Sequence, residues 1–147
     1  MTSIEKRQMC TEIAYTALKN GGGCVRVLSK KEKLNSGFDL ESREGERKDY
    51  IGVKIADKKG KFTISSAEYK AMNSSNDESE YVIHSYYVNN GKIESFSFYR
   101  FNKDSQLLVD ELDNRNVCAL QSRVLDNEGI STTVYDCIPM KKKKIVK

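Results

Sequence analysis

The spacing of apolar residues near the start of the chain is that of an amphipathic helix. They recur every three to four positions between residues 3 and 19, which places them on one face of an α-helix. Thr2 and Glu5 have the spacing of a capping box, and the glycine-rich stretch NGGG follows the last turn. We therefore predict a helix over residues 3 to 19. Its apolar stripe consists of Cys10, Ile13, Ala14, Ala17 and Leu18.

Short apolar segments follow this helix, separated by polar residues and glycine. They read CVRVL (24–28), GFDLE (37–41), YIGVKIA (50–56) and FTI (62–64). Segments of this length that alternate apolar and polar residues are typical of β-strands. We expect them to be successive strands of one sheet, joined by turns.

The second half of the chain combines a short helix with longer strands. Ser65 and Glu68 predict a capped helix over SSAEYKAM (65–72), followed by the polar loop NSSNDESE (73–80). Aromatic-rich strands at 80–88 and 92–101, joined by NNG, predict a hairpin. We also predict a helix over residues 103–115 and a final hairpin over residues 117–138.

These elements predict an α/β fold, with a mixed central β-sheet flanked by the first helix and by the helix at 65–72. A chain of 147 residues is long enough for one domain with a substantial core. We expect a single domain over residues 1–140 and a basic C-terminal tail over residues 141–147.

The positive charge of the chain is concentrated in that tail. The net charge is +4, but the tail KKKKIVK holds five of the 25 basic residues, which leaves 20 basic against 21 acidic residues in the rest. The long-range field of the folded body is therefore weak, and contact with a polyanion has to come from local clusters. Such a cluster follows the segment YIGVKIA and contains Lys58, Lys59 and Lys61.

The cysteines predict reduced thiols and a cytoplasmic location. The four of them show no CxxC spacing, and the single histidine cannot complete a zinc site with them. The turn DNEG (126–129) suits a type I turn with a glycine bulge, which would separate Cys118 from Cys137 across the final hairpin. No apolar run approaches the roughly 20 residues of a membrane span, so we expect no membrane association.

The stretch YIGVK (50–54) places a glycine and a lysine on the same face of a predicted strand. Because side chains alternate along a strand, Gly52 and Lys54 lie opposite Ile51 and Val53. By the same rule Asp39 and the residue two positions later, Glu41, share a face. If the two strands are neighbours, carboxylates and an ammonium converge, as metal-assisted phosphodiester hydrolysis requires.

The order of these motifs resembles a known family. A helix, then VRVLS, GFDLES, YIGVK, FTIS, SSAEYKAM and YVIHSYYV resembles the PD-(D/E)xK restriction-endonuclease-like superfamily. More narrowly, it resembles the domain at the C-terminus of the plant NO VEIN protein, also found beside bacterial restriction systems. The resemblance covers roughly residues 3 to 100. It implies a restriction-endonuclease-like core and a Mg²⁺-dependent DNA endonuclease.

The resemblance also assigns roles to single residues. Asp39 matches the family's first metal-binding aspartate and Lys54 its catalytic lysine, whereas Gly52 stands where the family has a glutamate. A second carboxylate would have to come from Glu41, from Glu68, or from Glu12 on the first helix. Glu68 is a candidate because some members of the superfamily carry the missing glutamate on that helix. Each also has a structural explanation: Glu41 as a solvent-facing strand residue, Glu68 as part of a capping box and Glu12 on a solvated helix face.

Two functional hypotheses follow from this resemblance. In the first, the protein is a nucleic-acid-directed endonuclease with a migrated metal site, in which Lys58, Lys59 and Lys61 draw in the substrate phosphates. In the second, it is a catalytically inactive nuclease-fold module that binds nucleic acid or a partner protein. Cutting of duplex DNA would call for a homodimer, for which the sequence contains no signal. His84 and the aromatic residues of the hairpin are better explained by packing than by catalysis or base stacking.

Overall fold

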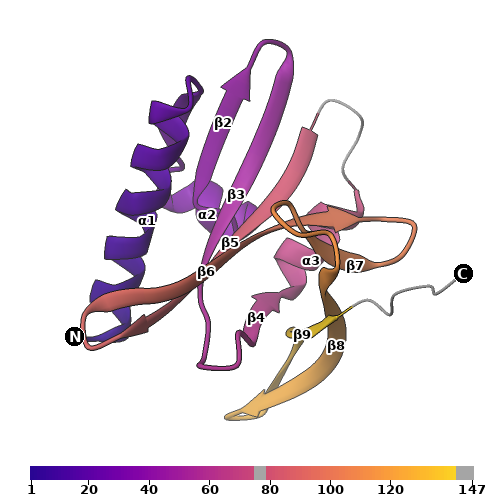
Figure 1. Cartoon of the computed structure of the whole chain (residues 1–147). Coiled ribbons are helices and arrows are strands. Elements are labelled where there is room, and N and C mark those ends of the chain that lie inside the picture. The colour runs from indigo at the N-terminus through magenta and orange to yellow at the C-terminus, as the bar shows by residue number, and fades with distance from the viewer. Residues whose placement is uncertain (75–78, 142–147) are drawn as a thin grey trace, which may run out of the picture.

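The computed structural model describes residues 1–74 and 79–141, which form a mixed sheet with helices packed against it (Figure 1). The described helices are α1 (Ser3–Asn20), α2 (Lys30–Ser36) and α3 (Ser66–Asn73). The described strands are β1 (Cys24–Val27), β2 (Leu40–Glu44), β3 (Arg47–Ile55), β4 (Phe62–Ser65), β5 (Ser79–Asn89), β6 (Lys92–Asn102), β7 (Leu107–Asp110), β8 (Asn116–Asn127) and β9 (Ile130–Lys141). The predicted mixed central sheet flanked by helices is confirmed at this level.

The described strands form one sheet in the order β1-β2-β3-β5-β6-β7-β8-β9-β4. β3 and β5 are parallel, and the other described pairs are antiparallel. The first three strands are neighbours, as predicted. β4 is not next to β3 in this order, however, because it pairs with β9 at the far end. The sheet curves so strongly that β4 and α3 return to the vicinity of β3 (Figure 1).

Helix α1 covers one face of the sheet. Its capping box is formed as predicted, with Thr2 and Glu5 each accepting a hydrogen bond from the other's backbone N–H. Cys10 and Ala14 are fully buried against the sheet residues Ile51 and Val53. Ile13 remains 42% exposed, so the buried stripe of α1 is narrower than the sequence predicted.

The larger core cluster lies within the curve of the sheet, against α3. Its members come from both ends of the chain: Leu28, Phe38, Ala56, Phe62, Ile64, Met72, Ile83, Tyr99, Leu108, Cys118 and Cys137. Alternate residues of β3 therefore face different partners. Ile51 and Val53 face α1, whereas Gly52 and Lys54 face the side that carries α3.

Helix α2 is an element that sequence reasoning missed. It lies between β1 and β2, in a segment expected to be a turn. Its capping box of Ser29 and Glu32 was a readable signal, and Gly37 ends the helix in the left-handed conformation with φ of 78°. The predicted strand over residues 37–41 consequently starts later, at Leu40.

The predicted helix over residues 103–115 is wrong. The segment contains the strand β7 instead, preceded by Gln106 with a positive φ of 56°. In β7 Leu108 and Asp110 are buried while Leu107 and Val109 are half-buried, the alternation of a strand. Pairing with β6 and β8 on either side outweighs the local helical pattern, because it satisfies the backbone groups of a segment inside the sheet.

The final hairpin is confirmed, but its predicted turn is wrong. Asn127 pairs with Ile130, and the two loop residues Glu128 and Gly129 both have positive φ, of 51° and 82°. This is the geometry of a two-residue turn with the right-handed twist of a hairpin. In the resulting register Cys118 pairs with Pro139, and all four cysteines are free thiols.

Two of the predicted segments lie partly outside the residues that the structure describes. Residues 75–78 of the predicted polar loop and residues 142–147 of the basic tail lie outside the described residues. Among the helices that are described, none has the length and apolarity needed to cross a membrane.

Candidate functional site

Asp39 lies directly before β2 and is held there by the backbone of β3. It follows Phe38, which is fully buried, and its own side chain is 3% exposed. The backbone N–H of Val53 donates a hydrogen bond of 2.8 Å to Oδ2. From α1, the guanidinium of Arg7 donates to Oδ1 at 3.1 Å. Arg7 also donates to Oδ2 at 3.3 Å, so the Asp39 carboxylate is fixed against β3 through Oδ2 and paired with the guanidinium through both oxygens.

Lys54 and Glu68 form a buried ion pair. Lys54 Nζ lies 2.7 Å from Glu68 Oε1, and the two side chains are 10% and 4% exposed. The same carboxylate oxygen accepts the backbone N–H of Ser65 at 3.0 Å and so completes the capping box of α3. The structural explanation of Glu68 is thus confirmed, because its carboxylate caps α3, and the same carboxylate also contacts Lys54.

The space above Gly52 is filled by this carboxylate. A Cβ atom placed on Gly52 would lie 3.4 Å from Glu68 Oε2, 3.1 Å from Ile83 Cδ1 and 3.3 Å from Phe38 Cδ1. Glu68 Oε2 is buried and, among the described residues, has no hydrogen-bond partner. A carboxylate thus lies beside position 52, supplied by α3 instead of β3, and one of its oxygens keeps its lone pairs for a further ligand.

Gly37 is a second glycine that this arrangement needs. Its φ of 78° favours glycine, and a Cβ atom there would clash with Cγ of Glu68. The turn that ends α2 therefore leaves the space through which the Glu68 side chain reaches β3.

Glu41 lies in a different ion-pair cluster. Its buried carboxylate contacts Arg26 at 2.8 Å, Lys48 at 3.1 Å and Arg43 at 3.5 Å. Burial raises the pKa of Glu41, but the hydrogen bonds from Lys48 and Arg26 outweigh it, and the net shift is downward. Glu41 is thus neither solvent-facing, as its structural explanation required, nor close to Lys54 in the way that Glu68 is. Glu12, the third candidate, is exposed on α1.

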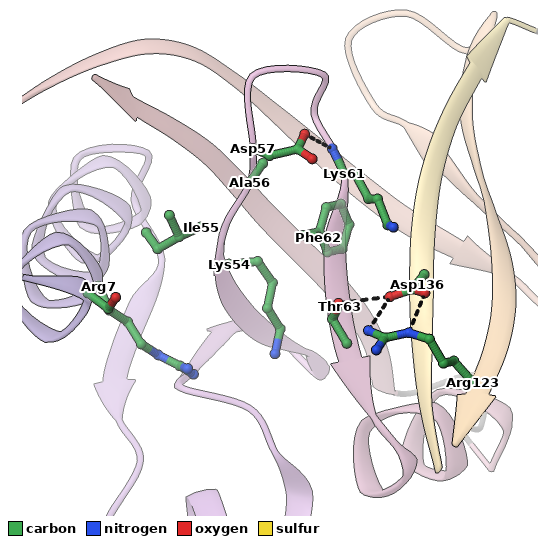
Figure 2. Close-up of a pocket in the computed structure, with 11 residues that line it drawn as sticks. Arg7, Lys54, Ile55, Ala56, Asp57, Lys61, Phe62, Thr63, Arg123 and Asp136 are labelled. Atoms are coloured by element: carbon green, nitrogen blue, oxygen red, sulfur yellow. Dashed lines mark hydrogen bonds and ion pairs between the residues drawn. The ribbon is translucent and has the colours of Figure 1, made fainter. Parts of the chain in front are cut away.

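A pocket of about 590 Å³ opens beside these residues (Figure 2). Four basic side chains and two acidic side chains line it: Arg7, Lys54, Lys61, Arg123, Asp57 and Asp136. Asp39 and Glu68 are not among the lining residues. Their cationic partners Arg7 and Lys54 stand between them and the pocket, so a ligand in the pocket meets positive charge first.

The three lysines of the loop after β3 do not line the same pocket. Lys61 lines this pocket, whereas Lys58 and Lys59 line a separate pocket beside Pro139. Sequence reasoning missed Arg7 and Arg123. Arg7 carries no local motif, and Arg123 is brought in by a hairpin more than 60 residues away along the chain from Lys54.

His84 is packed in the sheet, as its strand position suggested, but its Nδ1 is buried without a hydrogen-bond partner among the described residues. It is 5% exposed and stacks on Phe98 with ring centroids 4.1 Å apart. Burial, together with the charge of Arg100, lowers the pKa of His84 to about 4. The ring is therefore neutral at physiological pH, and it lies on the face of the sheet that α1 covers.

The carboxylates fit one mode of magnesium binding. In the part of the chain that the structure describes, no group of three or more histidine, cysteine, aspartate or glutamate side chains is placed to hold a metal. Mg²⁺, however, is commonly held by one or two carboxylates, with waters and substrate phosphate completing its shell. Asp39 and Glu68 are the two candidates for such ligands: Asp39 accepts the backbone N–H of Val53, Glu68 contacts the Lys54 ammonium, and Glu68 Oε2 lacks a hydrogen-bond partner in the described structure.

Comparison with known sequence families supports the narrower resemblance noted for the motifs, the one to the NO VEIN C-terminal domain. Residues 4–98 match the family described as Protein NO VEIN, C-terminal. The chain belongs to this family. The match runs from α1 into β6 and includes Asp39, Gly52, Lys54 and Glu68, whereas Arg123 and Asp136 lie beyond it. No protein with a curated description matches the chain.

Proposed function

We propose that this NO VEIN C-terminal domain is a nucleic-acid-directed protein of the restriction-endonuclease-like superfamily, a Mg²⁺-dependent DNA endonuclease whose second carboxylate has migrated to α3. The position of Glu68 carries the proposal. Its carboxylate lies over Gly52 and within 2.7 Å of Lys54, beside the strand that also holds Asp39. A glutamate that only caps a helix needs no contact with a lysine from a strand. The contact with Lys54 therefore favours a role for Glu68 in a metal site in addition to its role as a helix cap.

In this proposal each residue has a separate task. Asp39 and Glu68 would hold Mg²⁺, which when bound lowers the pKa of a coordinated water and offsets charge on the phosphate. The Lys54 ammonium orients the attacking water or neutralises charge that develops on the phosphate. Arg7, which is paired with Asp39 in the structure, would have to move aside for the metal to reach that carboxylate.

A second candidate function is a nuclease-fold module without cleavage that binds nucleic acid or a partner protein. One observation favours it. Both carboxylates are already neutralised by basic side chains, Asp39 by Arg7 and Glu68 by Lys54, and these cations face the pocket. A site of this kind could attract phosphate without metal, since the lining carries two more basic than acidic side chains.

A cleavage assay separates the two functions. Supercoiled plasmid and single-stranded DNA are incubated with the protein in Mg²⁺, Mn²⁺ or chelator. We expect metal-dependent cutting that is lost in Asp39→Asn and Lys54→Met. Asp110→Asn is the matched control, because Asp110 is also a buried aspartate but contacts the backbone of Leu112 away from the pocket. Glu41→Gln distinguishes the two carboxylates and should leave cutting intact. Cutting that survives in Asp39→Asn, or no cutting with any metal, would rule out the enzyme.

A further inference from the structure

Arg123 is held in a fixed position at the wall of the pocket. Its Nε and a terminal nitrogen donate to the two oxygens of Asp136 at 2.9 and 3.0 Å. Asp136 is 6% exposed and also accepts the hydroxyl of Thr63 at 3.1 Å, so the carboxylate that orients Arg123 is itself anchored. An arginine held in this way on a carboxylate loses little freedom when it binds a second anion.

The rest of the guanidinium is available to a ligand. Only two of the five N–H donors of a guanidinium are used by Asp136, and the Arg123 side chain is 48% exposed. Figure 2 shows the Arg123 and Arg7 head groups on opposite walls with the Lys54 ammonium between them. The three cations come from β8, α1 and β3, so the fold brings basic side chains from three separate elements to one pocket.

We propose that Arg123 is a phosphate-binding residue, and that the pocket receives the phosphodiester backbone of a nucleic-acid strand running from Lys54 to the β8–β9 hairpin. This rests on the proposed function for the identity of the ligand. A row of cations from separate elements is better matched to a polyanion with regularly repeated charge than to a single small anion. Bidentate N–H geometry makes arginine well suited to phosphate oxygens.

Arg123 is the one basic residue in the exposed part of the β8–β9 hairpin, which also carries Asp126 and Glu128 near its turn. Beyond the pocket the side chains of this hairpin from residue 121 to residue 132 are exposed, and the hairpin projects from the body of the molecule (Figure 1). The family match ends at residue 98, so this hairpin and its Arg123 lie outside the matched part of the chain. We therefore place a contact that positions the nucleic-acid strand, that of Arg123, outside the matched part of the chain.

Salt-dependent binding tests the assignment. Fluorescence anisotropy with a labelled DNA oligonucleotide is measured in chelator, so that no cleavage intervenes, at several salt concentrations. For Arg123→Gln we expect weaker binding and a plot of log affinity against log salt whose slope falls in magnitude by about 0.9 on duplex or about 0.7 on single-stranded DNA. Arg123→Lys should restore most of the slope, because it restores the charge, while binding stays weaker without the bidentate contact.

The matched control is Arg115→Gln. Arg115 is also paired with a neighbouring aspartate through Nε and a terminal nitrogen, but it lies away from the pocket. Its slope should equal that of the wild type. Thermal unfolding of each variant, followed by circular dichroism, identifies any loss of binding that comes from loss of the Arg123–Asp136 ion pair.

The outcomes separate this inference from the nuclease proposal. Binding that depends on Arg123 in a protein that never cuts DNA supports the inference and rejects the nuclease. Cutting with an Arg123→Gln slope equal to that of the wild type rejects the inference and leaves the nuclease. Absence of wild-type binding also overturns the inference, as does a mononucleotide or inorganic phosphate that displaces the oligonucleotide with equal strength, because the site would then recognise a single phosphate.

Discussion

Lys54 Nζ and Glu68 Oε1 lie 2.7 Å apart although β3 and β4, the strand that leads into the helix of Glu68, are not neighbours in the sheet. Lys54 belongs to β3, and Glu68 opens the helix that follows β4 at the far end of the strand order. The contact therefore ties the two ends of a curved sheet together. Because both side chains are at least nine-tenths buried, each charge depends on the other.

Removal of either partner of this pair should destabilise the protein. Lys54→Met leaves the Glu68 carboxylate buried without its cation, and Glu68→Gln leaves the ammonium in the same position. We expect each to lower the free energy of unfolding by about 3–5 kcal/mol. The double variant should be far less destabilised than the sum, as measured by urea unfolding of all four proteins. Additive losses would mean that the pair is not coupled.

A glutamate introduced at position 52 should not repair the site by itself. From the sequence alone, Gly52→Glu would restore the family pattern, but the space holds the Glu68 carboxylate and is bounded by Ile83 and Phe38. Crowding costs about 1–3 kcal/mol, and two buried carboxylates also repel each other. We therefore expect Gly52→Glu to lower the melting temperature.

A double variant that moves the carboxylate from position 68 to position 52 should be stabilised by the new glutamate, in contrast to Gly52→Glu alone. In Gly52→Glu combined with Glu68→Ala, the new glutamate replaces the carboxylate that Lys54 has lost. This double variant should melt at a higher temperature than Glu68→Ala alone. A Gly52→Glu protein as stable as the wild type, or a double variant less stable than Glu68→Ala, would contradict the idea that one carboxylate has changed elements.

Arg7 should compete with metal for Asp39. Its side chain is 49% exposed, so the ion pair adds at most about 1 kcal/mol to stability. In Arg7→Gln the Asp39 carboxylate loses its competing cation, and we expect several-fold tighter Mn²⁺ binding in calorimetry with little change in melting temperature. Asp39→Asn should abolish that binding, and Arg115→Gln serves as the surface-arginine control. Unchanged affinity in Arg7→Gln would show that Arg7 does not occupy the metal's position.

His84 should make the fold sensitive to mild acid. The folded protein holds the pKa of His84 at about 4, below the ordinary value of 6.5, so the unfolded chain binds the proton first as the pH falls. Stability is complete above about pH 6.5 and declines toward pH 4, with a loss of about 2 kcal/mol at pH 5. Urea unfolding at pH 7 and pH 5 measures this difference.

The variant His84→Phe isolates the contribution of the histidine. It keeps an aromatic ring against Phe98 and removes the titrating group. Carboxylates such as Asp136, whose pKa is lowered by Arg123, lose their contribution mainly below pH 5, outside this window. An equal pH dependence in His84→Phe would assign the effect to other groups.

Capping boxes in the sequence correctly predicted the start of two helices. The capping box of Thr2 and Glu5 marked α1, and Ser65 and Glu68 marked α3, because these side chains act within one turn of their own backbone. The same signal at Ser29 and Glu32 went unused. Residues 103–115 misled the prediction, since the burial of Leu108 depends on strands β6 and β8.

The sequence by itself determined that Gly52 and Lys54 share one face of a strand, since alternation is a property of the chain. The resemblance of its motifs named Asp39 and Lys54 and left Glu41, Glu68 and Glu12 open as the second carboxylate. Only the tertiary structure decided that Glu68, and not Glu41, supplies the carboxylate above Gly52, and that Arg7 and Arg123 reach the same pocket. The physical reason is that the sheet is curved and that β4 pairs with β9 at its far end, which brings together residues that no local pattern connects.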